Sequence, residues 1–306
     1  MTLPNFLVIG AMRAGTTALY RFLMQHPRIY MSPIKEPKFF ALENHPLDFL
    51  GPGDRARMRR DARTTQESYR ELFRGASTES AVGEASTFYL YSTEAPVNIH
   101  RRAPNMRLIA VLRHPAERAY SAYLHMVRRG FEPLRDFHAA LQAEAERSRA
   151  GWAPDNWHYR QMGFYATQLE RYFSLFDRKQ VRVYLYEDFC ADPVGTLQDM
   201  FRFLGVDPEF VPDVSLRYNV SGIPRSRRLQ ALINRPRTAL GKPLPEAWRL
   251  RIGLAVQRWN LTRPALGDEV WRDLLEGYRE DMLRLEDLIR RDLSGWLGGR
   301  GAVLRR

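Results

Sequence analysis

The chain has 306 residues, and its 44% hydrophobic and 27% charged content is typical of a globular protein with a sizeable core and excludes a disordered one. Its net charge of +12 favours an anionic partner (a nucleotide, an acidic glycan, nucleic acid or a membrane surface), although a generally basic protein has the same composition. The single cysteine, Cys190, excludes an intrachain disulfide, and no apolar run approaches the ~20 residues of a membrane span. The first predicted strand begins so early that it leaves no room for a signal peptide. We therefore expect a cytoplasmic protein.

The first predicted element is a buried parallel strand over Phe6–Ile9, a continuous apolar run that ends at Gly10. A helix is predicted to follow, capped by Thr16 or Thr17. Gly10 and Gly15 allow close backbone approach, and the N–H groups of the first helical turn would face an anion. The stretch therefore has the local architecture of a phosphate-binding loop.

This loop differs from the P-loop of nucleoside-triphosphate enzymes, although the spacing of its glycines is the same. The Lys-Ser/Thr pair that should follow the second glycine is absent, and the cation lies inside the loop as Arg13. We therefore expect a phosphate site without the triphosphate machinery. An ordinary strand-to-helix turn with no ligand fits the same residues.

A charged segment, Lys35-Glu36-Pro37-Lys38, follows a short strand candidate at Ile29–Met31. Glu36 can act here as a general base, and Lys35 and Lys38 can hold an anion. The alternative is a solvated charged turn.

The next stretches carry weaker signals. Residues 51–66 lack periodicity and are predicted to form an exposed basic loop, followed by a short helix at Tyr69–Phe73. Residues 81–89 are predicted to be a strand that ends in a polar loop. Glu84 in this strand is either structural or in contact with an acceptor.

A second clear buried strand, Met106–Leu112, runs directly into Arg113, and Ser121 lies two turns into the helix that follows. Ligands of open α/β sheets collect at the carboxyl ends of strands. An arginine with a nearby hydroxyl suits a phosphate monoester. Two such sites on successive strands indicate a nucleotide that is phosphorylated in two places.

The remainder supplies further helices, a third clear strand at Val181–Tyr186, and a proline- and arginine-rich segment at 213–246 that either folds over a bound anion or is an exposed basic linker. Helices are expected at residues 136–148, 163–176, 197–204 and 271–293. We predict a single α/β domain over residues 1–306, with a P-loop-like parallel sheet of about five strands flanked by helices and a basic lid near 215–245.

With these segments in hand, the chain resembles the sulfotransferases that use 3′-phosphoadenosine 5′-phosphosulfate (PAPS), in particular soluble bacterial members related to the heparan-sulfate-type enzymes. Phe6–Thr17 resembles their 5′-phosphosulfate loop, Leu108–Ser121 their 3′-phosphate motif, and Lys35–Phe40 the segment whose glutamate acts as base. Three further stretches look familial, so the likeness covers nearly the whole chain: Gly163–Phe173, Leu185–Phe189 and Arg290–Leu297.

The resemblance implies transfer of a sulfuryl group from PAPS to a hydroxyl or amine of a glycan, lipid or small molecule, with adenosine 3′,5′-bisphosphate (PAP) as product. Glu36 would take the proton of the acceptor, and Lys35, Lys38 and Glu84 would contact that acceptor. The donor would be held by Arg13, by the backbone of Ala14, Gly15, Thr16 and Thr17, by Arg113 and Ser121, and by Arg225 or Arg227 from the lid. No metal and no nucleic acid are expected, because the loop and the cations neutralise the phosphates.

The chain departs from the family pattern at two positions. Arg13 stands where many relatives have lysine, and because arginine stays charged we expect it to stabilise charge and not to donate a proton. Lys38 stands where some glycan-modifying relatives have histidine. The rival functions are a P-loop phosphotransferase, disfavoured by the missing Lys-Ser/Thr pair, and a non-catalytic binder of acidic polymers, disfavoured by Glu36 beside a donor loop.

Overall fold

A five-stranded parallel sheet forms the centre of the molecule, in the order β2-β3-β1-β4-β5. The computed structural model describes residues 3–215, 222–226, 229, 256, 259–262 and 264–298. The sheet confirms the predicted fold class and all five strand positions: β1 Phe6–Gly10, β2 Ile29–Met31, β3 Ala81–Ala85, β4 Arg107–Leu112 and β5 Val181–Leu185.

The central strand is the one whose sequence is apolar throughout. Phe6, Leu7, Val8 and Ile9 of β1 are fully buried, because β3 and β4 pair with the two edges of β1 and helices cover its faces. Since the three strands are parallel, the loops that follow them emerge at the same edge of the sheet.

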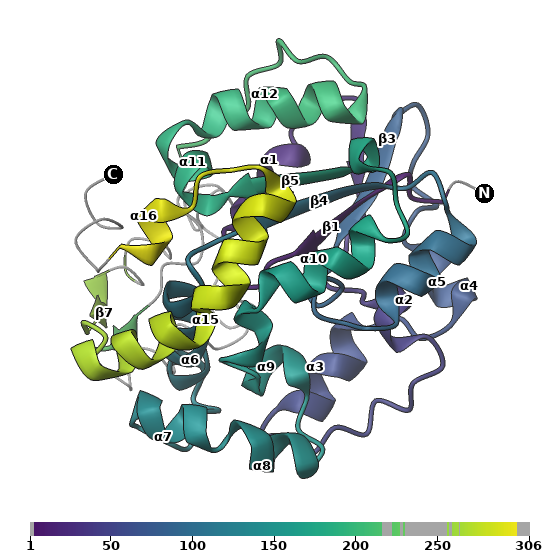
Figure 1. The fold of residues 1–306 in the computed structure, drawn as a ribbon. Coiled ribbons are helices and arrows are strands. Elements are labelled where there is room, and N and C mark those ends of the chain that lie inside the picture. Colours follow the sequence, from purple (N-terminus) through teal and green to yellow (C-terminus); the bar gives the residue numbers. More distant parts are fainter. Residues whose placement is uncertain are drawn as a thin grey trace.

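Helices lie on both sides of this sheet (Figure 1), where α12 appears above the strands and α10 and α6 appear below them. The described α-helices are α1 Thr16–Leu23, α2 Phe39–Leu42, α3 Asp54–Asp61, α4 Gln66–Glu71, α5 Ala95–Arg102, α6 Pro115–Arg129, α7 Phe137–Gln142, α8 Glu144–Arg149, α9 Pro154–Trp157, α10 Tyr165–Phe173, α11 Tyr186–Ala191, α12 Pro193–Leu204, α15 Asp268–Ile289 and α16 Ser294–Leu297. Two 3₁₀ turns, η1 Gln161–Gly163 and η2 Arg178–Gln180, complete them.

The prediction of a loop over residues 51–66 is wrong, because α3 occupies residues 54–61. Met58 is the only buried apolar residue in this helix, so the helix has no apolar periodicity to detect. Tertiary hydrogen bonds hold it instead. Asp54 is fully buried and accepts from the backbone N–H of Ala153, from Asn156 Nδ2 and from Trp157 Nε1 at 2.7–2.9 Å.

The C-terminal helix α15 is attached to the middle of the chain. Asp281 accepts hydrogen bonds from the backbone N–H groups of Ala166 and Thr167 at the start of α10, at 3.0 and 3.2 Å. Tyr278 donates its hydroxyl to the carbonyl oxygen of Arg160 at 2.7 Å. The predicted helix over 271–293 is thus confirmed over most of its length, as α15, and forms part of the core.

The segment predicted as a lid lies largely outside the described residues, as does Arg227. Its described part contains β6 Ile223–Pro224, which pairs antiparallel with β7 Leu261–Thr262. The single domain over 1–306 therefore stays a prediction. No helix within the described ranges is long and apolar enough to cross a membrane.

Candidate functional site

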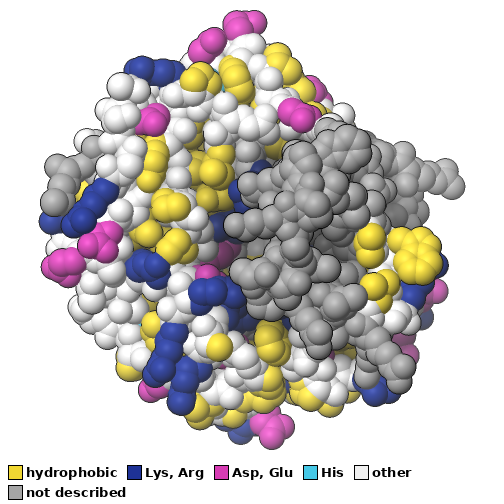
Figure 2. Space-filling model, turned by 180° about the vertical axis from the view of Figure 1, so that it is seen from behind, with side chains coloured by type: hydrophobic (Ala, Val, Ile, Leu, Met, Phe, Trp, Pro, Cys, Tyr) yellow, Lys and Arg dark blue, Asp and Glu magenta, His cyan; other side chains and the backbone are white. Residues whose placement is uncertain are grey.

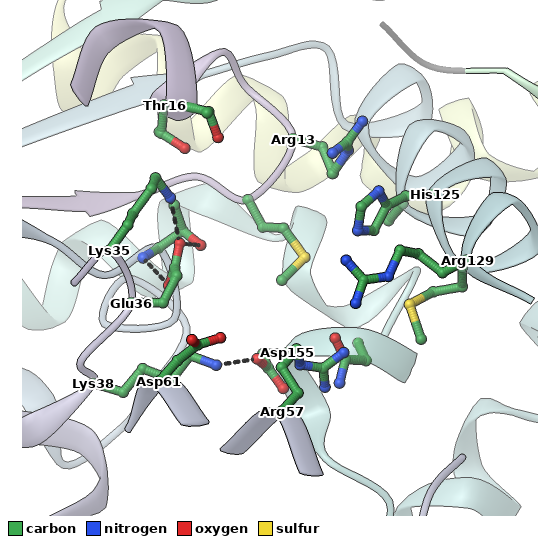
Figure 3. Close-up of a pocket in the computed structure, with 16 residues that line it drawn as sticks. Arg13, Thr16, Lys35, Glu36, Lys38, Arg57, Asp61, His125, Arg129 and Asp155 are labelled. Atoms are coloured by element: carbon green, nitrogen blue, oxygen red, sulfur yellow. Dashed lines mark hydrogen bonds and ion pairs between the residues drawn. The ribbon is translucent and has the colours of Figure 1, made fainter. Parts of the chain in front are cut away.

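A pocket opens where the loops after β1, β2 and β3 meet the helix α6 and the helices α3 and α9 (Figure 3). We call the predicted donor contacts Arg13–Thr17, together with Arg113 and Ser121, which contact Arg13 but do not line the pocket themselves, the donor end. We call the opposite side, formed by Lys38, α3, the end of α6 and α9, the acceptor wall. The pocket is lined by Met12, Arg13, Thr16, Thr17, Lys35, Glu36, Lys38, Arg57, Asp61, Thr87, Ala122, His125, Met126, Arg129, Asp155 and Asn156.

The donor end begins with a tight turn between β1 and α1. Gly15, and not a threonine, caps the helix: its φ of 81° is left-handed and no side chain caps the first turn, so the predicted threonine cap is wrong. A Cβ at Gly15 would approach the ring of Tyr186 to 2.9 Å, so this position needs glycine for shape as well as for φ. Thr16 and Thr17 are the first helical residues, and both line the pocket.

The two predicted phosphate motifs touch each other. Arg13 Nε donates to Ser121 Oγ at 3.2 Å, and Arg113 Nη1 donates to the carbonyl oxygen of Arg13 at 3.3 Å. Arg113 also pairs with Glu117 at 2.8 Å, and its guanidinium lies 5.0 Å from the ring centre of Tyr186. The β1 and β4 loops therefore form one cationic surface.

Positive charge is concentrated at Arg13. Burial, and then repulsion from Arg128 and Arg113, lowers the pKa of the Arg13 guanidinium to about 9. Burial likewise lowers the pKa of Arg128 to about 10. Both groups stay protonated at pH 7, and a bound anion would relieve the repulsion among them. This is the electrostatic environment that a phosphate or sulfate group fits.

The loop that carries Arg113 is supported from behind by the C-terminal region. His114 is fully buried, and burial lowers the pKa of its imidazole to about 4, so the ring is neutral. Its Nε2 lies 3.0 Å from the carbonyl oxygen of Trp296, and its ring stacks on Trp271 at 4.7 Å between ring centres. The position of the β4–α6 loop thus depends on α15 and α16.

Glu36 faces the pocket from the loop after β2. Its carboxylate accepts three hydrogen bonds: Oε1 from Lys35 Nζ at 2.6 Å and Thr87 Oγ1 at 2.9 Å, and Oε2 from the Thr87 N–H at 2.9 Å. Glu36 has a left-handed backbone, with φ of 68°, and both of its carboxylate oxygens contact Thr87. Thr87 was not predicted, although it lies two residues after the end of β3 and the strand-end rule applies to it.

Lys38 lies in the acceptor wall and is paired there. Its Nζ is 2.5 Å from Asp155 Oδ2, and the two side chains are only 4% and 3% exposed. Burial acts to raise the pKa of Asp155, but Lys38 and then Arg57 outweigh it, so the pKa stays below its ordinary value. The predicted anion-binding lysine is thus neutralised by a carboxylate from a segment far along the chain.

Glu84 is not brought to the pocket. It is fully buried within β3, accepts a hydrogen bond from Ser86 Oγ at 2.9 Å, and lies 3.4 Å from the hydroxyl of Tyr69. Burial raises its pKa to about 8. We therefore replace the predicted acceptor contact of Glu84 with a structural role behind the Lys38 segment, where Ser86 Oγ also accepts from the Lys38 N–H at 2.9 Å.

The acceptor wall contains residues that sequence reasoning missed. Arg57 extends from α3 and pairs with Asp54 at 2.9 Å, and Arg129 reaches the pocket from the end of α6. Between Arg129 and Arg13 lies His125, whose Nδ1 is 3.0 Å from Arg128 Nη2. Burial, and then Arg13, holds the pKa of His125 well below its ordinary value, so this ring is neutral.

Two further residues that we predicted to contact the donor, Ala14 and Arg225, make their described hydrogen bonds to other parts of the protein. The N–H of Ala14 donates to the carbonyl oxygen of Ala11 at 3.2 Å, within the turn itself. Arg225 is exposed beside the β6–β7 pair, where its Nε donates to Thr262 Oγ1 at 2.9 Å. A contact between Arg225 and the donor stays a prediction. Figure 2, which shows the molecule from behind the view of Figure 1, has several Lys and Arg side chains near its centre.

No group of three or more histidine, cysteine, aspartate or glutamate side chains that could hold a metal ion occurs among the residues that the structure describes. The donor end offers two arginines, the hydroxyl of Ser121 and the N-terminus of α1, an eight-residue helix. This set suits a phosphorylated ligand.

Comparison with known proteins agrees with this geometry. A family model described as "Sulfotransferase family" matches residues 4–210, from the start of β1 to the residues after α12. The chain belongs to the sulfotransferase family. That match confirms the family predicted from Arg13, Arg113 and their loops.

Among curated sulfotransferases, the bifunctional heparan sulfate N-deacetylase/N-sulfotransferase 4 of Mus musculus is 31% identical over 217 residues, which cover 68% of this chain and 23% of that protein. The carbohydrate sulfotransferase 15 of Homo sapiens is 30% identical over 256 residues, covering 67% of this chain and 44% of that protein. The chain thus corresponds to less than half the length of these relatives.

Two solved sulfotransferases extend the comparison to the fold. A sulfotransferase from Alicyclobacillus acidocaldarius is 35% identical and has a TM-score of 0.77, covering 97% of this chain and 99% of that one. Mouse SULT7A1, solved as a complex with PAP, has a TM-score of 0.51 at 14% identity, covering 94% and 86% of the two chains. The second likeness concerns the fold alone.

Proposed function

We propose that this sulfotransferase transfers a sulfuryl group from PAPS to a hydroxyl or amine of an acceptor. The observation that carries the proposal is the contact between the two strand-end motifs, in which Arg13 donates to Ser121 and Arg113 donates to Arg13. Two phosphate-type sites that share one cationic surface suit a nucleotide phosphorylated at both its 3′ and 5′ positions.

When bound, PAPS supplies an activated sulfuryl group, whose sulfur gains a bond to the acceptor oxygen or nitrogen as its bond to the phosphate oxygen breaks. Glu36 takes the proton that the acceptor loses. The three hydrogen bonds that Lys35 and Thr87 donate fix the Glu36 carboxylate in one orientation. A general base needs this fixed geometry more than it needs an unusual proton affinity.

Arg13 faces the place where charge develops on the departing phosphate. Its pKa of about 9 leaves it protonated at pH 7, and the N–H groups at the start of α1 act beside it. Arg13 therefore stabilises negative charge and does not transfer a proton. Arg113 and Ser121 hold the 3′-phosphate in the same proposal.

The acceptor is proposed to be a glycan, lipid or small molecule that carries an anionic group. Arg57 and Arg129 line the acceptor wall from different helices. Burial, and then repulsion from the Arg57 guanidinium, lowers the pKa of Arg129. A carboxylate or sulfate on the acceptor would relieve that repulsion. We place the reaction in the cytoplasm, in keeping with the single cysteine.

A thermal-shift comparison of PAP, ATP with Mg²⁺, and heparin tests the donor assignment. PAP is expected to stabilise the protein without metal, by about 2.7 kcal/mol at 100 times its dissociation constant, and ATP much less. Equal stabilisation by ATP and PAP that requires Mg²⁺ would instead indicate a phosphotransferase. Stabilisation by heparin alone would indicate a binder of acidic polymers.

Transfer itself is tested with ³⁵S-labelled PAPS and an acceptor panel containing a de-N-sulfated heparin oligosaccharide, 2-naphthol, dodecanol, and the 4-nitrophenyl β-glucuronide and β-glucoside pair. Labelled product is expected from at least one acceptor. A protein that binds PAP but labels none of them, and that releases no sulfate from PAPS to water, would contradict the proposed activity.

A further inference from the structure

The ion pair between Lys38 and Asp155 lies in the wall of the same pocket that Glu36 faces. Both members are almost fully buried, and Lys38 Nζ also contacts the sulfur of Met58, at 3.6 Å. Asp155 Oδ1 has no hydrogen-bond partner among the described residues, so the ammonium of Lys38 is the only described hydrogen-bonding partner of this carboxylate. Removing either side chain would therefore leave the other one buried without its ion-pair partner.

The backbone on which Lys38 and Glu36 lie is fixed. Glu36 donates its N–H to the carbonyl oxygen of Ala85 at 2.9 Å, and Lys38 donates its N–H to Ser86 Oγ at 2.9 Å. Both residues have left-handed backbones, with φ of 68° and 55°, and both side chains line the pocket. Since the Glu36 carboxylate is held by Lys35 and Thr87, a change in its separation from the Lys38 ammonium requires mainly rotation of the Lys38 side chain.

Without Asp155, two carboxylates of the pocket lining remain for the Lys38 ammonium: Glu36, two residues away in the sequence, and Asp61, which already pairs with Arg60 at 2.7 Å. Glu36 already has one ammonium partner, Lys35 at 2.6 Å. A second would occupy the lone pairs that the acceptor proton needs and would weaken the carboxylate as a base. The chain thus has a competing cation next to its base and a second carboxylate that holds that cation.

We propose that Asp155 is a positioning residue that holds the Lys38 ammonium away from Glu36 and so leaves Glu36 available to the acceptor. This inference rests on the proposed role of Glu36 as the base. It makes Asp155 matter to the reaction through Lys38 alone, and not through a contact with donor or acceptor.

A crystal structure of the Asp155→Asn protein with PAP tests the geometric half of the inference without any assay of activity. The expected result is that Lys38 Nζ moves to within hydrogen-bond distance of Glu36. A lysine that stays beside the substituted amide or turns elsewhere would overturn the inference, even if sulfuryl transfer is normal.

A double-mutant cycle tests the chemical half, with ³⁵S-labelled PAPS and the best acceptor of the panel. Asp155→Asn is expected to lower kcat roughly tenfold, within the range of couplings between contacting residues, with little change in KM or in the affinity for PAP. In a Lys38→Met protein, the same Asp155→Asn change should alter kcat less than threefold, because no competing ammonium remains.

The cycle distinguishes the other roles of Asp155. A rise in KM that Lys38→Met does not suppress would mean that Asp155 contacts the acceptor, and equal losses in both backgrounds would mean that it acts without Lys38. If Asp155→Asn alone does not fold, the comparison of Lys38→Met with the double variant can still overturn the inference, because a loss of kcat in that pair, which contains no unpaired buried lysine, means that Asp155 acts without Lys38. Wild-type protein that binds PAP and transfers nothing would contradict the proposed function instead.

Discussion

The donor end of the pocket is built from the loops and helices that follow β1 and β4, whereas the acceptor wall is built from side chains that pair across long stretches of sequence. At the donor end, Arg13 and Arg113 occupy positions set by β1 and β4, and their contact follows from the parallel pairing of those strands. In the acceptor wall, Lys38 meets Asp155 and Asp54 meets Trp157 only because separate helices pack together.

The difference indicates which part of the site is tied to the fold and which is free to vary. The backbone of a donor end made by strand ends and a helix N-terminus is positioned by the sheet, so its place in the molecule cannot change without changing the sheet. An acceptor wall made by paired side chains can change charge or shape by substitution at two positions. We therefore expect variants at the two ends to have separable effects, on donor affinity and on acceptor use.

The largest effect is expected at Glu36, where the two ends meet. Glu36→Gln keeps the size of the side chain but cannot accept a proton, so turnover should fall by about 10²–10⁴-fold. PAP affinity should stay within a few-fold. Single-turnover transfer from labelled PAPS measures the first quantity and titration calorimetry the second. A near-normal rate would remove Glu36 from the chemistry and leave the base unassigned.

Arg113 tests whether the donor end reads the 3′-phosphate. Arg113→Ala should weaken PAP by roughly 1.5–3 kcal/mol, the range for hydrogen bonds to charged groups. Adenosine 5′-phosphosulfate, which lacks that phosphate, should bind almost unchanged, and Arg202→Ala on the exposed side of α12 is the charge-matched control. Equal weakening of both ligands, measured by calorimetry, would make Arg113 a structural residue of the loop.

Arg129 tests the charge of the acceptor wall. Arg129→Gln should reduce the preference for 4-nitrophenyl β-glucuronide over the β-glucoside, measured as the ratio of kcat/KM values, by about two- to fivefold, as for an exposed ion pair. Arg59→Gln, which removes an exposed charge from α3, should leave the ratio unchanged. If both variants change it alike, the preference comes from net charge and not from this wall.

The last prediction concerns stability and not catalysis, at Glu84 beneath the Lys38 segment. Its folded-state pKa of about 8 lies above the ordinary value of 4.5, so the unfolded chain loses this proton first and stability falls as pH rises from about 4.5 to about 8. Glu84→Gln lacks this titration. Its melting temperature relative to wild type should therefore rise between pH 5 and pH 8, whereas exposed Glu67→Gln should show no such trend.

The sequence was sufficient to predict the sheet and most of the donor end. Continuous apolar runs such as Phe6–Ile9 identified buried strands, and polar residues at their carboxyl ends, including Arg113, identified the cationic surface. Thr87 could have been found by the same rule, since it follows β3. The prediction of a threonine cap was wrong because the residue before the helix has a left-handed backbone, which favours glycine, so the cap position is Gly15.

The acceptor wall could not be predicted in the same way. Helix α3 has a single buried apolar residue, Met58, and it is held by Asp54 through bonds to residues about a hundred positions away. The partner of Lys38, Asp155, is equally remote in sequence. Local patterns carry no signal for such contacts, because they arise only after the helices have packed.

The support that the C-terminal region gives to His114 has a consequence for exchanging parts between family members. The family match ends at residue 210, yet the loop bearing Arg113 rests on Trp271 and on the backbone of Trp296. A chimera that joins residues 4–210 of this chain to the C-terminal region of a relative would keep every residue of the donor end. It would also need an aromatic ring and a backbone carbonyl that fit this imidazole, so the compatible unit of exchange is larger than the segment that carries the motifs.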